Sequence, residues 1–341
     1  MRFQSLWFTA PFQVEVRETD LPPLAAGQVL VQTLCSAISP GTEMLVYRGQ
    51  FPSGLAVDAT LGALAGAFSY PLRYGYAAVG RVTELGPGVA PEWAGRLVFA
   101  FQPHASAFVA APAELFPVPA GLAPEDAVLL PNMETAVNFL LDGAPLLGER
   151  VAVLGQGIVG LLTTALLARF PLAALATADR FPLRRAAALE LGAPASLDPA
   201  AEDAGAQLRQ ALGAATDADG ADLVYELSGA PAALDLAIAV AGFAGRIVVG
   251  SWYGQKRHAV DLGGRFHRGR LRLISSQVST LTPELQARWT KARRLAVAWQ
   301  QLAALRPARL ITHRFPLSEA AAAYALVDQR PAEAIQILLQ L

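Results

Sequence analysis

The stretch VAVLGQGIVGLLTTALLA, residues 151–168, decides how this chain folds. Its first four residues are apolar, as in a buried strand, and residues 158–169 have the composition of a buried helix. Glycines separate these two parts, so we expect a strand, a tight turn and a helix in that order. The stretch approaches the length and apolarity of a membrane span, but Gly155 and Gly157 interrupt it near one end. A strand, turn and helix of a globular domain therefore explain it better.

The turn carries the pattern G-x-G-x-x-G, formed by Gly155, Gln156, Gly157, Ile158, Val159 and Gly160. That pattern is weak evidence by itself, but here it follows an expected strand, opens into an expected helix, and precedes Asp179 at the end of the next expected strand. Gly155 permits the turn, Gly157 lets the backbone approach a pyrophosphate, and Gly160 lets the helix pack closely on the strand. The N–H groups at the start of the helix then bind phosphates. The sequence predicts a dinucleotide site in a Rossmann unit.

The residues around Asp179 bear on which dinucleotide binds. Its carboxylate would accept hydrogen bonds from the adenosine ribose and would repel a 2′-phosphate, which favours NAD over NADP. Arg180, with Arg184 and Arg185 one helical turn further on, could instead pair with a 2′-phosphate. We therefore expect NAD, and NADP stays open as the alternative.

The pattern of apolar residues and turn residues changes near Pro131. Before it, short apolar runs alternate with Pro and Gly clusters, which is typical of antiparallel β-structure. After it, apolar strands alternate with helices, which predicts βαβ units and a parallel sheet. The expected strands are 151–154, 175–178, 223–226, 246–250, 271–277 and 335–339, and the expected helices are 158–169, 182–191, 231–241 and 318–327. The fold class is therefore α/β, with a β-rich domain beside a doubly wound parallel sheet.

Composition excludes several classes of partner. The chain has 341 residues, of which 53% are hydrophobic, so two domains with large cores are expected. A net charge of −1 with 16% charged residues gives no basic surface for nucleic acid or an anionic membrane. Cys35 is the one cysteine, which rules out an intrachain disulfide, and the N-terminus lacks the pattern of a signal peptide. We expect a cytoplasmic protein with a small-molecule ligand.

Several further segments carry a resemblance to a known family. They are residues 41–43, 47–49, 75–80, 84–89, 221–226 and 245–250, in addition to the glycine pattern. In this order they resemble the medium-chain dehydrogenase/reductase superfamily along nearly the whole chain. The resemblance implies a GroES-like catalytic domain at residues 1–131 and 278–341, and a Rossmann domain at 132–277. It also implies that Thr135 lies against the nicotinamide and that the edge strand 271–277 pairs two copies into a homodimer.

The residues that hold zinc in many relatives are missing. Pro40 stands where those relatives have a cysteine, Tyr76 and Ala77 stand where they have a histidine and a glutamate, and Pro131 replaces the third ligand. A single cysteine cannot supply the four-cysteine structural zinc site either. We therefore expect a protein without zinc.

Without a Lewis acid, hydrogen-bond donors must manage the reacting oxygen. The resemblance places Thr42 beside that oxygen, so its hydroxyl is the first candidate. Tyr76 is the second, because a phenol can donate to an oxyanion and transfer a proton; alternatively, it only fills the volume that zinc vacates. His104, expected on a loop at the substrate channel, is the third candidate, although a loop histidine is more often solvated or already hydrogen-bonded.

Three functions are compatible with these residues. The first is hydride transfer between NAD(H) and an alcohol or carbonyl on a small or medium-sized apolar substrate. The second is a quinone or enoyl reductase that acts on a conjugated double bond, and the third is a dinucleotide-binding protein without turnover. Residues 36–43 also resemble the branch that contains hydroxyethyl-bacteriochlorophyllide dehydrogenases, which favours alcohol oxidation.

Overall fold

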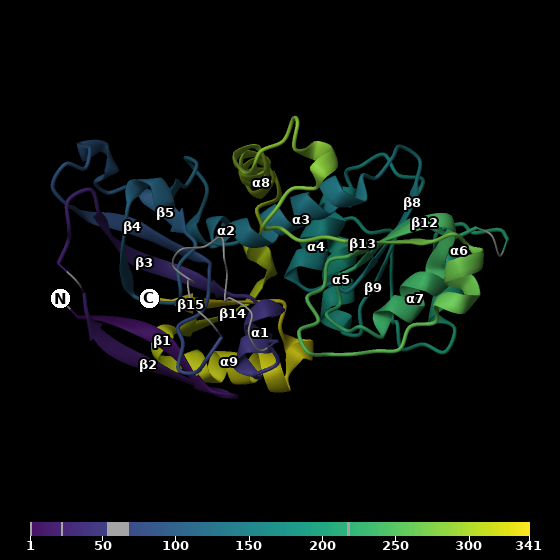
Figure 1. Ribbon diagram of the computed structural model, residues 1–341, viewed down its shortest axis with the longest axis horizontal. Helices are drawn as coiled ribbons and strands as arrows, with labels where there is room; N and C mark the ends of the chain where they lie inside the picture. Colours follow the sequence, from purple (N-terminus) through teal and green to yellow (C-terminus); the bar gives the residue numbers. More distant parts are fainter. Residues whose placement is uncertain (1, 22, 53–67, 217–218) are drawn as a thin grey trace. The chain divides into compact units, whose positions relative to one another are not determined.

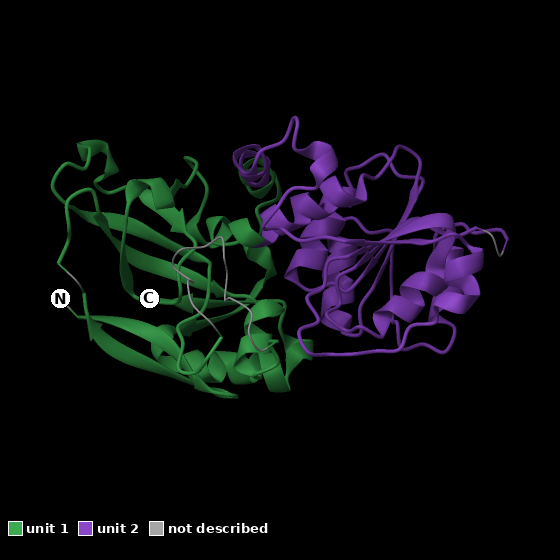
Figure 2. Cartoon of the chain, in the orientation of Figure 1, with its two compact units in different colours: residues 1–131, 299–341 green, residues 132–298 purple. Residues whose placement is uncertain are grey.

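The computed structural model describes residues 2–21, 23–52, 68–216 and 219–341. The chain divides into two compact units, shown in Figure 2. Unit 1 comprises residues 1–131 and 299–341, and unit 2 comprises residues 132–298.

Unit 2 is built on a parallel sheet of six strands (Figure 1). In chain order they are β8 (Arg150–Leu154), β9 (Ala174–Ala178), β10 (Ala195–Leu197), β11 (Ala221–Glu226), β12 (Ala241–Val249) and β13 (Arg272–Ser275). Their order in the sheet is β10-β9-β8-β11-β12-β13, and every pair is parallel. This is the strand order 3-2-1-4-5-6 of a Rossmann fold, so the predicted doubly wound sheet is confirmed.

Both faces of this sheet are buried, which explains why its strands are apolar runs. Alternate residues of β8 belong to two separate hydrophobic clusters: Ala152 and Leu154 to one, Val151 and Val153 to the other. Helices α6 (Ala204–Ala211) and α7 (Ala233–Val240) contribute to the first cluster, and α3 (Leu130–Gly143) and α4 (Ile158–Leu167) to the second. Helix α5 (Pro182–Glu190) follows β9. The helices therefore cover the sheet on both sides.

Unit 1 is β-rich. Its larger sheet has the order β14-β15-β3-β4-β5-β7, and β6 also pairs with β3. The strands are β3 (Val29–Ile38), β4 (Ala78–Leu85), β5 (Leu97–Ala100), β6 (Ala107–Ala110), β7 (Phe116–Pro117), β14 (Ile311–Pro316) and β15 (Gln336–Gln340). A separate antiparallel hairpin joins β1 (Arg2–Ala10) and β2 (Gln13–Asp20). Because β15 pairs with β3, the end of the chain returns to the first domain.

Two helices pack with the hairpin into one core of unit 1. They are α1 (Thr42–Tyr47) and α9 (Ala320–Gln329). Buried Leu6 and Phe8 of β1 share a hydrophobic cluster with Met44 of α1 and Tyr324 of α9. The short helix α2 (Pro124–Ala127) also belongs to this unit. The cluster brings residues from opposite ends of the chain together.

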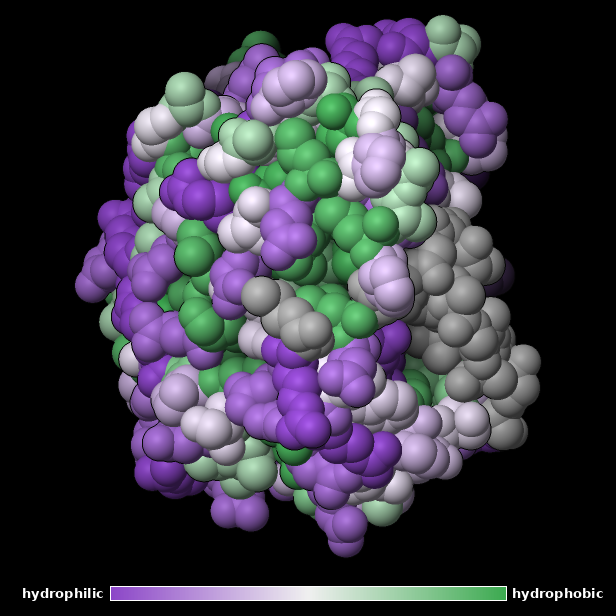
Figure 3. Space-filling view, turned by 90° about the vertical axis from the view of Figure 1, so that its left-hand side faces the viewer, coloured by the Kyte–Doolittle hydropathy of each residue, from purple (hydrophilic) through white to green (hydrophobic). Residues whose placement is uncertain are grey.

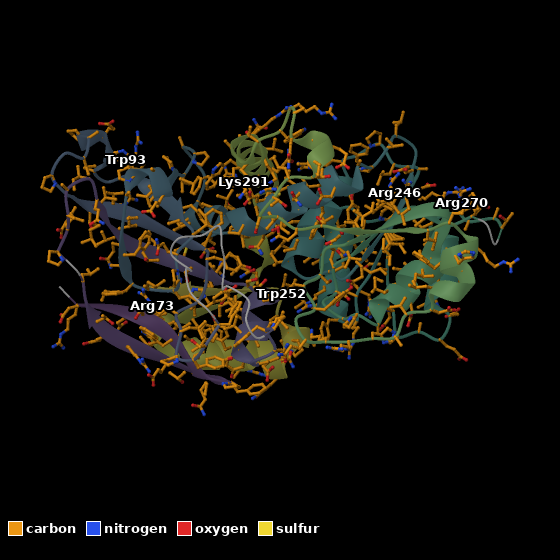
Figure 4. All side chains as sticks on the ribbon, viewed as in Figure 1. Arg73, Trp93, Arg246, Trp252, Arg270 and Lys291 are labelled. Carbon is orange, nitrogen blue, oxygen red and sulfur yellow. The ribbon has the colours of Figure 1, made fainter. Side chains whose placement is uncertain are left out.

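The second crossing between the units lies within a helix. Helix α8 (Lys291–Leu305) begins at Lys291, labelled in Figure 4, and passes from unit 2 to unit 1 after Ala298. Sequence analysis ends the Rossmann domain at residue 277 instead. The buried Arg294 accounts for the longer unit, because it donates to the Glu134 carboxylate at 2.7 Å and to a backbone carbonyl of the 278–280 segment. The two compact units are defined by contacts, so the expected boundary of the Rossmann domain at residue 277 stays a prediction.

The apolar stretch 151–168 is divided between β8 and α4, which has ten residues. Within the described ranges, no helix combines the length and apolarity needed to cross a bilayer. Hydrophobic residues also reach the surface between hydrophilic ones, as Figure 3 shows for one face. In a chain with 53% hydrophobic residues, such scattered exposure is ordinary.

Candidate cofactor and active sites

The glycine-rich turn between β8 and α4 requires glycine at two positions. Gly155 has a φ of +96°, and a Cβ there would lie 2.5 Å from the Cα of Ser228. A Cβ on Gly160 would lie 2.0 Å from the carbonyl oxygen of Gly155. Neither neighbour is a flexible side chain, so any larger residue would displace backbone.

Gly157 differs from both, because a Cβ added there meets no atom within 4 Å. It is the N-cap of α4, so the first N–H groups of a ten-residue helix follow it, through Ile158 and Val159. Open space beside such donors suits an anion, and the residues present fit the pyrophosphate of a dinucleotide.

Asp179 follows β9 and is buried. Its carboxylate accepts hydrogen bonds from the backbone N–H of Gln156 at 2.7 Å and of Phe181 at 2.9 Å. The side chain therefore fixes the glycine-rich turn against the end of β9, a role that sequence analysis did not assign. Each carboxylate oxygen has a second lone pair, so Asp179 can still accept ribose hydroxyls.

The three arginines after Asp179 have different environments. Arg180 is exposed, and its guanidinium lies 5.8 Å from the centre of the Phe181 ring. Arg184 lies 4.8 Å from the same ring, and burial lowers the pKa of its guanidinium while Asp179 opposes that shift. Arg185 donates to the carbonyl oxygens of residues 179 and 180 and to the carboxylate of Asp198. The guanidinium of Arg185 is thus occupied by hydrogen bonds within the protein, and Arg180 is the most exposed of the three arginines.

A second acidic residue lies next to the glycine-rich turn and was missed by sequence analysis. Glu226 ends β11 and is fully buried. It accepts hydrogen bonds from the backbone N–H of Ser228 at 2.8 Å and from the hydroxyl of Tyr253 at 2.5 Å. Tyr253 lies in the segment after β12, next to Trp252, and Figure 4 labels Trp252. Burial and the nearby Glu226 raise the pKa of Tyr253, so this phenol stays protonated.

In unit 1, Tyr76 donates a hydrogen bond from its phenol to Oγ of Ser39 at 2.6 Å. Thr42 stands three residues beyond Ser39, at the first position of α1, and is half-buried. The structure therefore brings Tyr76 to the segment that leads into Thr42. Ser39 was not among the predicted site residues.

Glu43, the residue after Thr42, is fully buried. Its Oε1 accepts the backbone N–H of Ser39 at 2.9 Å. Its Oε2 lies 2.9 Å from Nε2 of His104 and accepts the phenol hydrogen of Tyr324 at 2.5 Å. A carboxylate without solvent is stable only when such donors surround it.

His104 is also fully buried, so it is not a solvated loop residue. Its Nδ1 contacts Oγ of Ser36 on β3, and its Nε2 contacts Glu43. Gly75 makes room for the ring, because a Cβ at that position would lie 2.6 Å from Nε2 of His104. Burial, together with Glu43, raises the pKa of Tyr324 well above its ordinary value.

Thr135, the predicted nicotinamide contact, lies on α3 in unit 2 and is half-buried. The residue before it, Glu134, pairs with the buried Arg294. Burial raises the pKa of Glu134, and Arg294 opposes that shift. Unit 2 therefore holds Thr135 on the same helix as a buried ion pair.

The donor set does not fit a catalytic zinc of the kind that relatives bind. Zinc takes Cys, His, Asp or Glu ligands, whereas Pro40, Ala77 and Pro131 offer no ligand atom and Tyr76 offers a phenol already bonded to Ser39. Over the described part of the chain, no group of three or more His, Cys, Asp or Glu side chains could hold a metal ion.

Comparison with known proteins connects these sites to a family. Residues 159–297 match the family described as zinc-binding dehydrogenase. L-threonine 3-dehydrogenase of Pyrococcus horikoshii is 25% identical over 267 residues, covering 69% of this chain and 72% of that protein. D-guloside 3-dehydrogenase of Escherichia coli K12 is 23% identical over 310 residues, covering 86% of each chain.

These similarities support the resemblance to the medium-chain dehydrogenase/reductase superfamily. Two solved structures show that the chain has the expected fold. An alcohol dehydrogenase of E. coli CFT073 in complex with NADH superposes with a TM-score of 0.79 at 20% identity, covering 100% of this chain and 99% of the other. A zinc-binding dehydrogenase of Sinorhizobium meliloti 1021 bound to NADP gives 0.78 at 19% identity, covering 100% of both. Both curated relatives are dehydrogenases, which are oxidoreductases.

Proposed function

We propose that this chain is an NAD-dependent dehydrogenase that interconverts an alcohol and a carbonyl without zinc. The observation that carries the proposal is the Tyr76 phenol, which stands where relatives have a zinc ligand and is hydrogen-bonded to Ser39 at 2.6 Å. A phenol at this position replaces a Lewis acid by a proton donor. NAD(H), when bound, supplies or accepts the hydride.

The preference for NAD rests on Asp179. The carboxylate is fixed against the glycine-rich turn by Gln156 and Phe181, so it cannot easily move away from a phosphate on the ribose. Gly155, Gly157 and Gly160 with the start of α4 would hold the pyrophosphate, and Thr135 would contact the nicotinamide. The compared structures contain NADH in one case and NADP in the other, so they are compatible with either dinucleotide.

In this proposal Tyr76 and Thr42 act on the reacting oxygen, and His104 does not. Both ring nitrogens of His104 already have partners, Ser36 and Glu43, in a fully buried position. His104 therefore supports Glu43 and holds the segment before Thr42 in place. This assigns a supporting role to the third candidate of the sequence analysis.

A substrate screen tests the proposal. Purified protein is assayed with primary and secondary alcohols and NAD, and with enones and NADH, beside a fluorescence titration of NADH binding. Turnover of an alcohol supports the proposal, turnover of enones alone supports a quinone or enoyl reductase, and binding without turnover supports a non-catalytic protein.

Variants then test the two hydroxyl groups. Tyr76→Phe and Thr42→Val each remove one donor to a developing oxyanion, which typically costs about 3 kcal/mol or roughly a hundredfold in rate. NADH affinity should stay within about twofold, because the dinucleotide is held by other residues. Tyr70→Phe is the matched control, since its phenol donates to the Val46 carbonyl instead. Activities of Tyr76→Phe and Thr42→Val within threefold of the parent on the best substrate would refute this assignment.

The zinc-free reaction has a direct test. We expect no stoichiometric zinc by elemental mass spectrometry and full activity in the presence of a chelator. One tightly held zinc per chain, with activity lost on its removal, would overturn the interpretation of Pro40, Tyr76 and Pro131.

We also propose that the chain forms a homodimer through β13. This strand is at the edge of the parallel sheet, and its Leu273 is 41% exposed. Edge strands offer free hydrogen-bonding groups to a second copy. Light scattering at micromolar concentration should report twice the mass of the chain, and a monomer would contradict the proposal.

A further inference from the structure

We propose that Ser39 is a positioning residue for Tyr76, which accepts the phenol hydrogen bond at rest and donates its own hydroxyl hydrogen once the Tyr76 proton has moved to the substrate. The inference rests on the proposed function, in which Tyr76 is the proton donor. It adds a residue to which the sequence analysis gave no role.

The contact itself has the required chemistry. Oγ of Ser39 lies 2.6 Å from the phenol oxygen of Tyr76, and Ser39 is only 9% exposed. A serine hydroxyl is both a donor and an acceptor, and its hydrogen can rotate without movement of the oxygen. A carbonyl at the same place could only accept. Ser39 can therefore contact Tyr76 equally well before and after proton transfer.

The backbone of Ser39 is held in place by a buried network. Its N–H donates to Glu43 at 2.9 Å, and the same carboxylate is fixed by His104 from one loop and Tyr324 from α9. Glu43 is 0% exposed, so water does not compete for these bonds. Because these bonds hold the carboxylate, the backbone of Ser39 is fixed at the place where its hydroxyl contacts Tyr76.

The proton transfer is balanced as follows. When a carbonyl oxygen gains negative charge, the O–H bond of Tyr76 breaks, its proton bonds to the substrate oxygen, and the electron pair stays on the phenolate. Ser39 then donates a hydrogen bond to that phenolate, which lowers its free energy. A proton from water restores the phenol. Alcohol oxidation uses the same groups in reverse.

Kinetics of Ser39 variants test the inference on the best substrate from the screen. We expect Ser39→Ala to lower kcat about tenfold, as for the loss of one hydrogen bond to a charged group, with KM and the NADH dissociation constant within twofold. Ser39→Thr keeps the hydroxyl and should stay within threefold of the parent. Ser106→Ala is the control, because its hydroxyl accepts a backbone N–H of Gln4 outside this network.

The double variant separates coupling from independent effects. If Ser39 acts only through Tyr76, Ser39→Ala combined with Tyr76→Phe should be as active as Tyr76→Phe alone, within threefold. If instead the fold-decreases in kcat of the two single variants multiply in the double variant, Ser39 acts independently of Tyr76, and the inference is overturned. Circular dichroism and thermal unfolding check that each variant is folded.

A second readout requires no substrate. With tyrosine labelled at Cζ by carbon-13, the Tyr76 resonance is assigned from its loss in Tyr76→Phe and followed with pH. If Ser39 donates to the phenolate, Ser39→Ala should raise the Tyr76 pKa by about one unit, corresponding to the loss of one such hydrogen bond. The ionisable groups of this network and beside it, Glu43, His104, Tyr74 and Tyr324, are the same in both proteins.

The outcomes distinguish the two proposals. An unchanged or lowered Tyr76 pKa in Ser39→Ala, with kcat within threefold, overturns the inference and leaves the proposed function intact if Tyr76→Phe is inactive. A fully active Tyr76→Phe removes the proposed function, and the inference falls with it.

Discussion

The cofactor turn of unit 2 and the polar cluster of unit 1 are built in opposite ways. The turn consists of Gly155 to Gly160 and the nearby Asp179, and its glycines lie against backbone atoms of the turn itself and of Ser228. The cluster around Glu43 joins Ser39, His104 and Tyr324, and its longest link spans 281 residues. In the first, Gly155 and Gly160 make room for backbone and Gly157 faces open space; in the second, buried side chains form hydrogen bonds with one another.

The difference determines what each region tolerates. Atoms of the turn contact backbone, so an added methyl group acts at once on local geometry. Side chains of the cluster contact one another through hydrogen bonds, so removal of one side chain leaves its buried partners without a hydrogen bond. We therefore expect enlargement to damage the turn and truncation to damage the cluster.

The largest effect is expected from truncation in the cluster. Glu43→Ala leaves the buried donors of Ser39, His104 and Tyr324 without their acceptor, which should lower the free energy of unfolding by about 4 kcal/mol. Urea denaturation measures the change. The control is Glu114→Ala, in which an exposed glutamate also accepts a backbone N–H, that of Ala111. A loss no greater than in the control would show that the buried network does not stabilise unit 1.

Enlargement of the turn should separate folding from binding. Gly160→Ala places Cβ against the Gly155 carbonyl, so we expect the free energy of unfolding to fall by about 2–3 kcal/mol. We expect NADH binding to be lost as well. Gly157→Ala meets no protein atom, so its unfolding midpoint should match the parent while NADH binds more weakly. Thermal unfolding and NADH fluorescence measure both. Equal stability of the two variants would contradict the packing argument.

The charge at the turn gives a smaller effect. NADH should bind at least tenfold more tightly than NADPH, about 1.4 kcal/mol, because Asp179 would repel the 2′-phosphate. Fluorescence titration at moderate salt measures both affinities. Arg180→Ala should change neither by more than about twofold if Arg180 does not pair with the ligand. Equal affinities in the parent, with NADPH binding lost in Arg180→Ala, would assign the site to NADP.

The smallest effect concerns the polar cluster of Asp142, Asn138 and Ser276, which has no proposed function. It tests whether a cluster assembled from distant segments can be purely structural. Asp142 accepts hydrogen bonds from Asn138 and Ser276, and burial raises its pKa above the ordinary 3.8. The folded protein then binds this proton more tightly than the unfolded chain. The ionised carboxylate therefore costs stability above pH 3.8, increasingly until the pH passes the raised pKa.

Asp142→Asn keeps the shape and an acceptor oxygen without the charge. Its stability relative to the parent should increase as pH rises through that window, as measured by urea denaturation at several pH values. Turnover should be unchanged. A relative stability that falls with rising pH would contradict the direction of the shift.

Sequence patterns predicted most of the parallel sheet, and the exceptions have physical causes. The expected strands at 151–154 and 223–226 are confirmed as β8 and β11, because each contains an apolar run, residues 151–154 and residues 223–225. Strand β10 was missed, since it has three half-buried residues and no apolar pattern. Helix α8 was missed because the fully buried Arg294 interrupts its apolar face. Its guanidinium is tolerated because Glu134, Asn138 and backbone carbonyls of residues 278 and 280 accept its hydrogen bonds, which no local pattern shows.

The sequence by itself determined the cofactor turn, because glycine spacing and one acid after the next strand specify backbone geometry within a short segment. Together with the family resemblance, it also predicted a site without zinc ligands, from Pro40, Tyr76, Ala77 and Pro131. The tertiary structure decided that Asp179 fixes the turn, that Ser39 contacts Tyr76, and that His104 is a buried partner of Glu43. A buried polar group needs partners, and those partners can come from any part of the chain, so only the folded molecule identifies them.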